Sequence, residues 1–141
     1  MIEIKGNQGE KVFINIHRRL YPDAVQNQDI DFLEATIKIS FPEFTALYRF
    51  FIRSSEIEYW IRQRNELIVL KKSVRFTTLE ENMVINLQIE KNGISVWNFE
   101  LRDQENKSKL YLQLESELST VDLFMSQLAN VLKLYPIPTY A

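Results

Sequence analysis

Acidic side chains gather in one short stretch of the chain, at Asp23, Asp29, Asp31 and Glu34. Paired carboxylates can hydrolyse a glycosidic bond, but that chemistry needs a defined separation across a substrate cleft. Carboxylates also bind calcium, although this stretch lacks the Asp-x-Asp-x-Asp-Gly spacing and its central glycine. A solvated loop is the first interpretation, a protein-binding patch the second and catalysis the third. We take these four acids as candidate partner-binding residues, because an acidic surface steers a basic partner.

The residue types that most other catalytic sites require are scarce or missing. Cysteine is absent, and His17 is the one histidine, so thiolate nucleophiles and Cys- or His-based metal sites are excluded. Serines are present, but no Gly-x-Ser-x-Gly motif accompanies them. The three glycines leave little material for a phosphate-binding loop. We therefore expect no enzyme activity, no cofactor and no metal, with His17 as a structural or surface residue.

The charge balance argues against broad nucleic-acid binding. The chain has 17 lysines and arginines against 19 aspartates and glutamates, a formal charge of −2. Its basic cluster, from Arg62 to Arg75, is interleaved with glutamates and is typical of a solvated helix face. The first residues do not resemble a signal peptide, and no apolar run is long enough to cross a membrane. The expected location is the cytoplasm.

An alternation of apolar and polar residues dominates the chain and predicts β-strands. It runs through residues 33–39, 44–52, 83–89, 94–101 and 110–114, with shorter strands expected at 2–4, 12–16 and 74–77. The strand over 44–52 is apolar on both faces, so it is either central or has an outer contact surface. Asn92-Gly93 lies between two of these strands and predicts a tight hairpin of type I′.

Two segments switch to the helical period. One helix is expected from about Ser55 to Lys71, opened by a capping box of Ser55 with Glu58. Trp60 lies on its apolar face and is expected in the core. A second helix is expected from about Ser119 to Tyr135, where Pro136 prevents its continuation.

The order of these elements predicts an α+β fold in one domain over residues 1–141. Strands and helices do not alternate, which disfavours a parallel doubly wound sheet. We expect a twisted antiparallel sheet of about seven to eight strands, with two α-helices packed on one face. The polar stretch from Leu20 to Ile30 is expected to be a loop.

Several short segments follow one another in a characteristic order along the chain. They are Leu20-Tyr21-Pro22-Asp23, Asp31-Phe32-Leu33-Glu34, Phe50-Phe51-Ile52-Arg53-Ser54, Ser55-Glu56-Ile57, Asn92-Gly93, Asp103-Gln104 and Leu134-Tyr135-Pro136. In this order they resemble the WapI-type immunity proteins of bacterial contact-dependent toxin systems, and the similarity covers nearly the whole chain.

The resemblance implies a small cytoplasmic protein that binds and neutralises the toxin domain made by its own cell or its siblings. It brings no catalytic residues. Such toxins are often nucleases, whose basic substrate clefts suit an acidic inhibitor surface. The implied partner is a cognate toxin domain, without direct contact to nucleic acid or membrane, and the chain itself is expected as a monomer or weak dimer.

Two other hypotheses remain open at the level of the sequence. The first is a small-ligand-binding or enzymatic α+β domain, with a pocket between sheet and helices lined by aromatic residues on neighbouring strands. Those residues are Phe44, Tyr48, Phe50 and Trp97. Such a pocket would have a volume of at least about 300 Å³. The second is an assembly subunit that pairs through an exposed strand edge.

Overall fold

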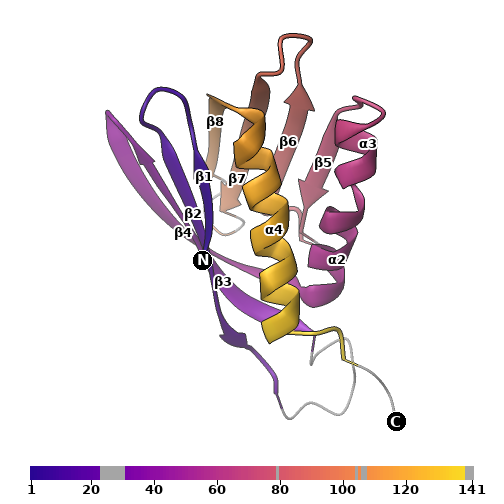
Figure 1. Ribbon diagram of the computed structural model, residues 1–141. Helices are drawn as coiled ribbons and strands as arrows, with labels where there is room; N and C mark the ends of the chain where they lie inside the picture. Colours follow the sequence, from indigo (N-terminus) through magenta and orange to yellow (C-terminus); the bar gives the residue numbers. More distant parts are fainter. Residues whose placement is uncertain (23–30, 79, 104, 106–107, 139–141) are drawn as a thin grey trace.

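Eight antiparallel strands and three helices make up the described part of the chain in the computed structural model, which confirms the α+β class (Figure 1). The structure describes residues 1–22, 31–78, 80–103, 105 and 108–138. The first sheet contains β1 (Ile2–Lys5), β2 (Lys11–Arg19), β3 (Phe32–Phe41) and β4 (Phe44–Arg53). The second contains β5 (Val74–Thr77), β6 (Met83–Ile89), β7 (Ser95–Asp103) and β8 (Ser108–Ser116). The helices are α2 (Ser54–Arg62), α3 (Arg64–Ile68) and α4 (Leu118–Leu134).

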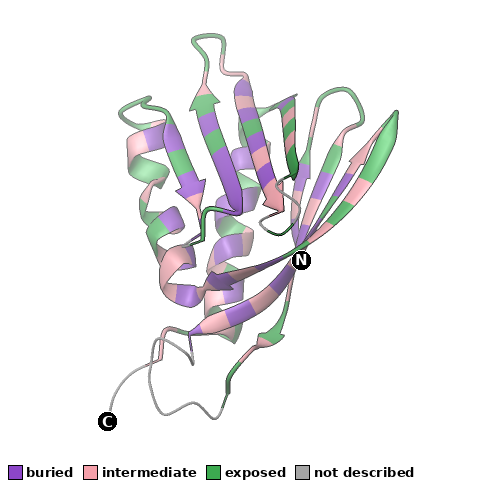
Figure 2. Ribbon diagram, turned by 180° about the vertical axis from the view of Figure 1, so that it is seen from behind, coloured by how far each residue is buried: buried purple, intermediate pink, exposed green. Residues whose placement is uncertain are grey.

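The strands divide into two sheets where the sequence predicted one. Each strand pairs with its neighbour in the chain, in the orders β1-β2-β3-β4 and β5-β6-β7-β8. The helices α2 and α3 connect β4, an edge strand of the first sheet, to β5, an edge strand of the second. Each sheet has one apolar face, and these faces and the helices together enclose a single core (Figure 2).

Aromatic side chains link the helices to the second sheet. Trp60 of α2 packs on Phe76 of β5 with 5.4 Å between ring centroids, which confirms its predicted core position. Phe124 of α4 contacts both Phe76 and Trp97, the latter edge-on at 5.2 Å. The indole N–H of Trp97 donates to the hydroxyl of Ser116 at 2.8 Å, so this buried polar group is satisfied.

The helix expected from Ser55 to Lys71 is interrupted. The N–H of Gln63 donates to the carbonyl of Trp60, three residues back, at 3.1 Å. This tighter turn ends α2 at Arg62 and starts α3 along a new direction. The interruption allows Leu67 to reach the core although polar residues precede it. No helix in the described ranges is long and apolar enough to cross a membrane.

The hairpin between β6 and β7 forms as predicted, but its turn type differs. Only Gly93 has a positive φ, at 85°, whereas type I′ requires two such residues. The N–H of Gly93 donates to the carbonyl of Glu90, and the side chain of Asn92 accepts from the N–H of Ile94. The loop is therefore a type I turn closed by a left-handed glycine, with Asn92 bonding the backbone through its side chain.

Candidate functional site

Asp31 supports the start of a helix from outside that helix. Its carboxylate accepts from the N–H of Ser54 at 2.8 Å and of Ser55 at 3.3 Å, and from both serine hydroxyls. Asp31 is 6% exposed. The first N–H groups of a helix have no partner within it, and a carboxylate also interacts favourably with the helix dipole. This acid therefore anchors the segment before β3 to α2 and presents almost no surface to a partner.

The capping box expected from Ser55 and Glu58 is wrong in register. The helix begins one residue earlier, and the N–H of Arg53 donates to the carboxylate of Glu56 at 3.3 Å. The Arg53 guanidinium also pairs with Glu56, at 3.0 Å. Local spacing missed this arrangement because Asp31, 23 residues before Ser54, takes the role that Ser55 was expected to play.

Glu34 lies on the outer face of the first sheet, between two arginines. Its carboxylate is 2.8 Å from Nε of Arg18 and 3.7 Å from Nε of Arg49. The hydrogen bond from Arg18, opposed by burial and assisted by both guanidinium charges, holds the pKa of Glu34 below its usual value. The charge of Glu34 is thus balanced by two arginines of the same sheet. Asp23 and Asp29 lie outside the described residues.

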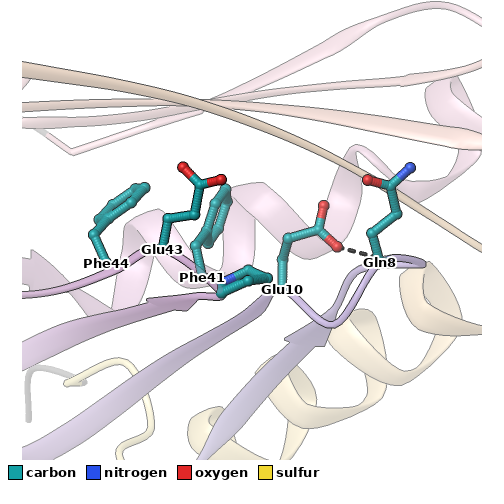
Figure 3. A pocket seen from close by; sticks show the side chains of 6 residues that line it. Gln8, Glu10, Phe41, Glu43 and Phe44 are labelled. Atoms are coloured by element: carbon teal, nitrogen blue, oxygen red, sulfur yellow. Dashed lines mark hydrogen bonds between the residues drawn. The ribbon is translucent and has the colours of Figure 1, made fainter.

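A hollow between the hairpin tips of the first sheet and strand β8 is a candidate site. Its first pocket, of about 220 Å³, lies where the β1–β2 and β3–β4 turns meet. The labelled side chains project to one side of the ribbon, with two carboxylates among two aromatic rings (Figure 3). The pocket is lined by Gln8, Glu10, Phe41, Pro42, Glu43 and Phe44.

A second pocket, of about 210 Å³, shares Gln8 and Glu10 with the first and extends it to β8. It is lined also by Asn7, Gln113, Leu114 and Glu115. The N–H of Asn7 donates to the carbonyl of Glu115 at 2.8 Å, which fixes the β1–β2 turn against β8. Carboxylates from two turns and from strand β8 thereby line these two pockets.

A third, apolar pocket of about 140 Å³ lies farther along β4, the strand that also supplies Phe44 to the first pocket. It is lined by Ala46, Leu47, Tyr48, Leu101, Asp103, Ser108, Lys109 and Leu110. An apolar cavity of similar size holds one benzene ring, so this pocket has room for one apolar side chain. Burial raises the pKa of Tyr48, and the carboxylates of Asp103 and Glu80 raise it further. Its phenol therefore stays protonated and remains a hydrogen-bond donor.

We call these three pockets together the hairpin groove. Its rim carries the carboxylates of Glu10, Glu43, Glu115 and Asp103 against the single ammonium of Lys109 among the lining residues. The sequence did not reveal this site, because its residues come from three distant hairpins. Only two local signals in the sequence belong to its walls. They are the turn at Pro42-Glu43 and the short glycine-flanked turn after β1.

In the described part of the chain, the four aromatic residues considered as a pocket lining do not line one common pocket. Phe50 and Trp97 are buried in the core, and β4 and β7 belong to different sheets. The pockets of the hairpin groove are each smaller than the 300 Å³ expected of a small-molecule site.

The structure also shows the surroundings of His17 and of the acidic side chains. His17 is exposed, and its Nε2 forms a hydrogen bond with the Thr36 hydroxyl at 2.8 Å, as expected for a surface residue. Among the described residues no group of three or more acidic or His side chains could hold a metal.

Comparison with known families decides the relationship of this chain. The model of the immunity protein WapI-like family matches residues 2–136. The chain belongs to the WapI-like family. No curated protein matches this WapI-like chain.

Two solved plant proteins share the fold. The plant transcriptional regulator PBF-2 superposes with a TM-score of 0.56 and 10% identity, over 94% of this chain and 79% of that one. WHY1 from Arabidopsis thaliana gives a TM-score of 0.54 and 14% identity, over 95% and 82%. At these identities the likeness concerns the arrangement of strands and helices alone.

Proposed function

We propose that this WapI-like chain is an immunity protein that binds a cognate toxin domain in the cytoplasm and neutralises it by protein contact. The observation that carries the proposal is the family match over residues 2–136. The chain would act by occupying a surface of the toxin, without chemistry of its own. A monomer or weak dimer suffices for this role.

The hairpin groove supports a contact with a basic toxin surface. Protein interfaces combine an apolar centre with a polar rim. Phe41, Phe44 and Tyr48 supply aromatic surface in the groove, and Glu10 and Glu43 supply negative charge beside them. A nuclease would present such a basic surface, because its active site must attract a polyanionic substrate.

The acidic loop remains part of the proposal in altered form. Asp23 and Asp29 are proposed partner contacts, and Glu34 adds a charge on the outer face of the first sheet. Asp31 would act indirectly, since its carboxylate holds the start of α2. Neither Asp31 nor Glu34 lines the pockets of the groove, so the acidic stretch and the groove can be tested by separate substitutions.

A toxin whose gene adjoins this one provides the test. Co-production with its C-terminal domain should restore growth, and an inactive form of that domain should form a complex with this chain. Growth arrest despite co-production, together with no complex, would refute the proposed function.

Charge substitutions test the groove within that complex. Replacing either Glu10 or Glu43 singly with Gln should slow association at low salt and much less at high salt, because attraction between surfaces acts mainly on the association rate. Glu66→Gln is the matched control, since it removes a carboxylate on α3, on the opposite side of the molecule from the hairpin tips (Figure 1). An equal effect of the control would assign the change to net charge and would remove the groove from the interface.

A further inference from the structure

The two sheets have four edge strands, and within the described residues each of these edges makes a hydrogen bond with another element. On β1, the N–H of Glu3 donates to the side-chain oxygen of Gln127 from α4. On β5, the carbonyl of Thr77 accepts from the indole of Trp60. On β8, the carbonyl of Glu115 accepts from the N–H of Asn7. Proteins commonly cover strand edges in such ways, because an open edge pairs with other chains.

The fourth edge, β4, makes its bond at its last residue, where the N–H of Arg53 donates to Glu56 of α2, and it is open from Thr45 to Phe51. The N–H of Ser54 donates to the carbonyl of Asp31 across the ladder from β3. Because bonding alternates along an antiparallel strand, the even-numbered residues of β4 bond to β3 and the odd-numbered ones point away. The outward backbone groups belong to Thr45, Leu47, Arg49 and Phe51. Within the described part of the chain, no hydrogen bond from outside the first sheet reaches these groups.

Nothing in the geometry of β4 discourages pairing. Its register with β3 is continuous from Phe32 with Arg53 to Phe41 with Phe44, without a bulge. The strand contains no proline, and the side chain of Leu47 is 71% exposed. A long, regular and partly apolar edge of this kind is the surface to which an extended segment adds as a further strand.

We propose, resting on the proposed function, that an extended segment of the protein partner adds to β4 as a fifth strand of the first sheet. Side chains of an added strand point alternately to the two faces. On the inner face, one apolar side chain enters the 140 Å³ pocket beside Ala46 and Tyr48. On the outer face, an acidic side chain meets Arg49 and its neighbour Lys38, which pairs with Leu47 in the ladder.

Charge distinguishes this occupant from a second copy of the chain. Arg49 is exposed, and it shares Glu34 with Arg18, which is closer to that carboxylate. Lys38 has no ion pair among the described residues. The outward positions of β4 itself carry Thr, Leu, Arg and Phe, so a second β4 would bring no acid to this face. A partner segment with acidic residues at alternate positions would supply the negative charge that this face lacks.

Hydrogen exchange of individual amides, measured on the chain with the inactive toxin domain, tests the proposal. The amides of Thr45, Leu47, Arg49 and Phe51 should exchange at least about tenfold more slowly in the complex. The amides of Ala46, Tyr48 and Phe50 should change little, because they already bond to β3. This alternation is the signature of strand addition, since burial under a docked surface would slow both sets.

Leu47→Pro provides a second measurement. Proline removes an outward N–H, and an edge strand tolerates it where that N–H faces solvent. With Leu47→Ala as the matched control for the lost side chain, the proline variant should bind about three- to tenfold more weakly, the effect of one hydrogen bond. Its unfolding transition is compared first. If the proline variant does not fold, the exchange pattern of the unaltered chain decides.

The outcomes separate the inference from the function on which it rests. No complex with the toxin domain refutes the proposed function. A complex in which the four alternate amides exchange as fast as in the free chain overturns strand addition and leaves the function standing. Protection of these amides in the free chain that grows with its concentration also overturns the inference, because it assigns the edge to a second copy.

Discussion

Replacement of Asp31 should destabilise the fold more than it affects any surface. In Asp31→Ala, the N–H of Ser54 loses its shorter acceptor and keeps only the backbone carbonyl of residue 31, at 3.3 Å, while the buried hydroxyl of Ser54 and the hydroxyl of Ser55 lose the carboxylate altogether. A buried donor without a partner costs about 1–3 kcal/mol, and the loss of a helix cap about 0.5–2 kcal/mol. We therefore expect a loss of about 3 kcal/mol in the free energy of unfolding. For a chain of this length, that lowers Tm by about 10 °C.

Asp31→Asn should cost about half as much, because its amide keeps one acceptor for Ser54 and places an N–H₂ group toward Ser55. Urea unfolding followed by circular dichroism measures both variants, with the slope m checked for constancy. A double-mutant cycle with Ser55→Ala should show coupling of at least about 0.5 kcal/mol. If Asp31→Ala unfolds within about 0.5 kcal/mol of the unaltered chain, the anchoring role is refuted. A slower association with the toxin at unchanged stability would instead make Asp31 a direct contact.

Three further predictions concern residues away from the groove. Glu34 has a lowered pKa in the folded chain, so its ionised form stabilises the fold above the unfolded value of about 4.3 and stops doing so as pH falls through the folded value. The stability lost in Glu34→Gln at pH 7 should therefore shrink in urea unfolding as pH falls below about 4.3. Gly93→Ala should cost about 1–2 kcal/mol through its positive φ alone, because a Cβ there meets nothing within 4 Å. Trp97→Phe removes the donor to the buried Ser116 hydroxyl, and Ser116→Ala in that background should recover part of the lost stability.

The sequence predicted elements well wherever one face of a strand is buried. Leu33, Ile37 and Ile39 alternate with polar residues, and all three are fully buried in β3. A period of two follows directly from the pleat, so tertiary context does not alter it. The Asn92-Gly93 hairpin was also located correctly, because it lies between two such alternating strands. The residue type of Asn92 did not determine its backbone conformation. The break at Gln63 had no sequence signal stronger than a polar stretch.

The division into two sheets and the candidate site depend on contacts between distant segments. Glu10, Glu43 and Glu115 are ordinary turn or surface acids in the sequence, and only the packing of the hairpins brings them to one groove. For Asp31 the sequence was misleading in the opposite direction. It seemed a surface acid among acids, and its burial depends on two serines that follow a later strand. Charge type was visible in the sequence, but exposure was not.

The bond between Glu3 and Gln127 has a consequence for synthesis of the chain. These residues are separated by 124 positions, and a ribosome adds about 5–20 residues per second. The edge of β1 therefore stays uncovered for about 6–25 s until α4 has been made. Every strand pair, in contrast, forms between neighbours in the chain and can close earlier. During that interval the growing chain exposes two uncovered edges, β1 and β4, on the same sheet. Completion of α4 covers the first and leaves only the second.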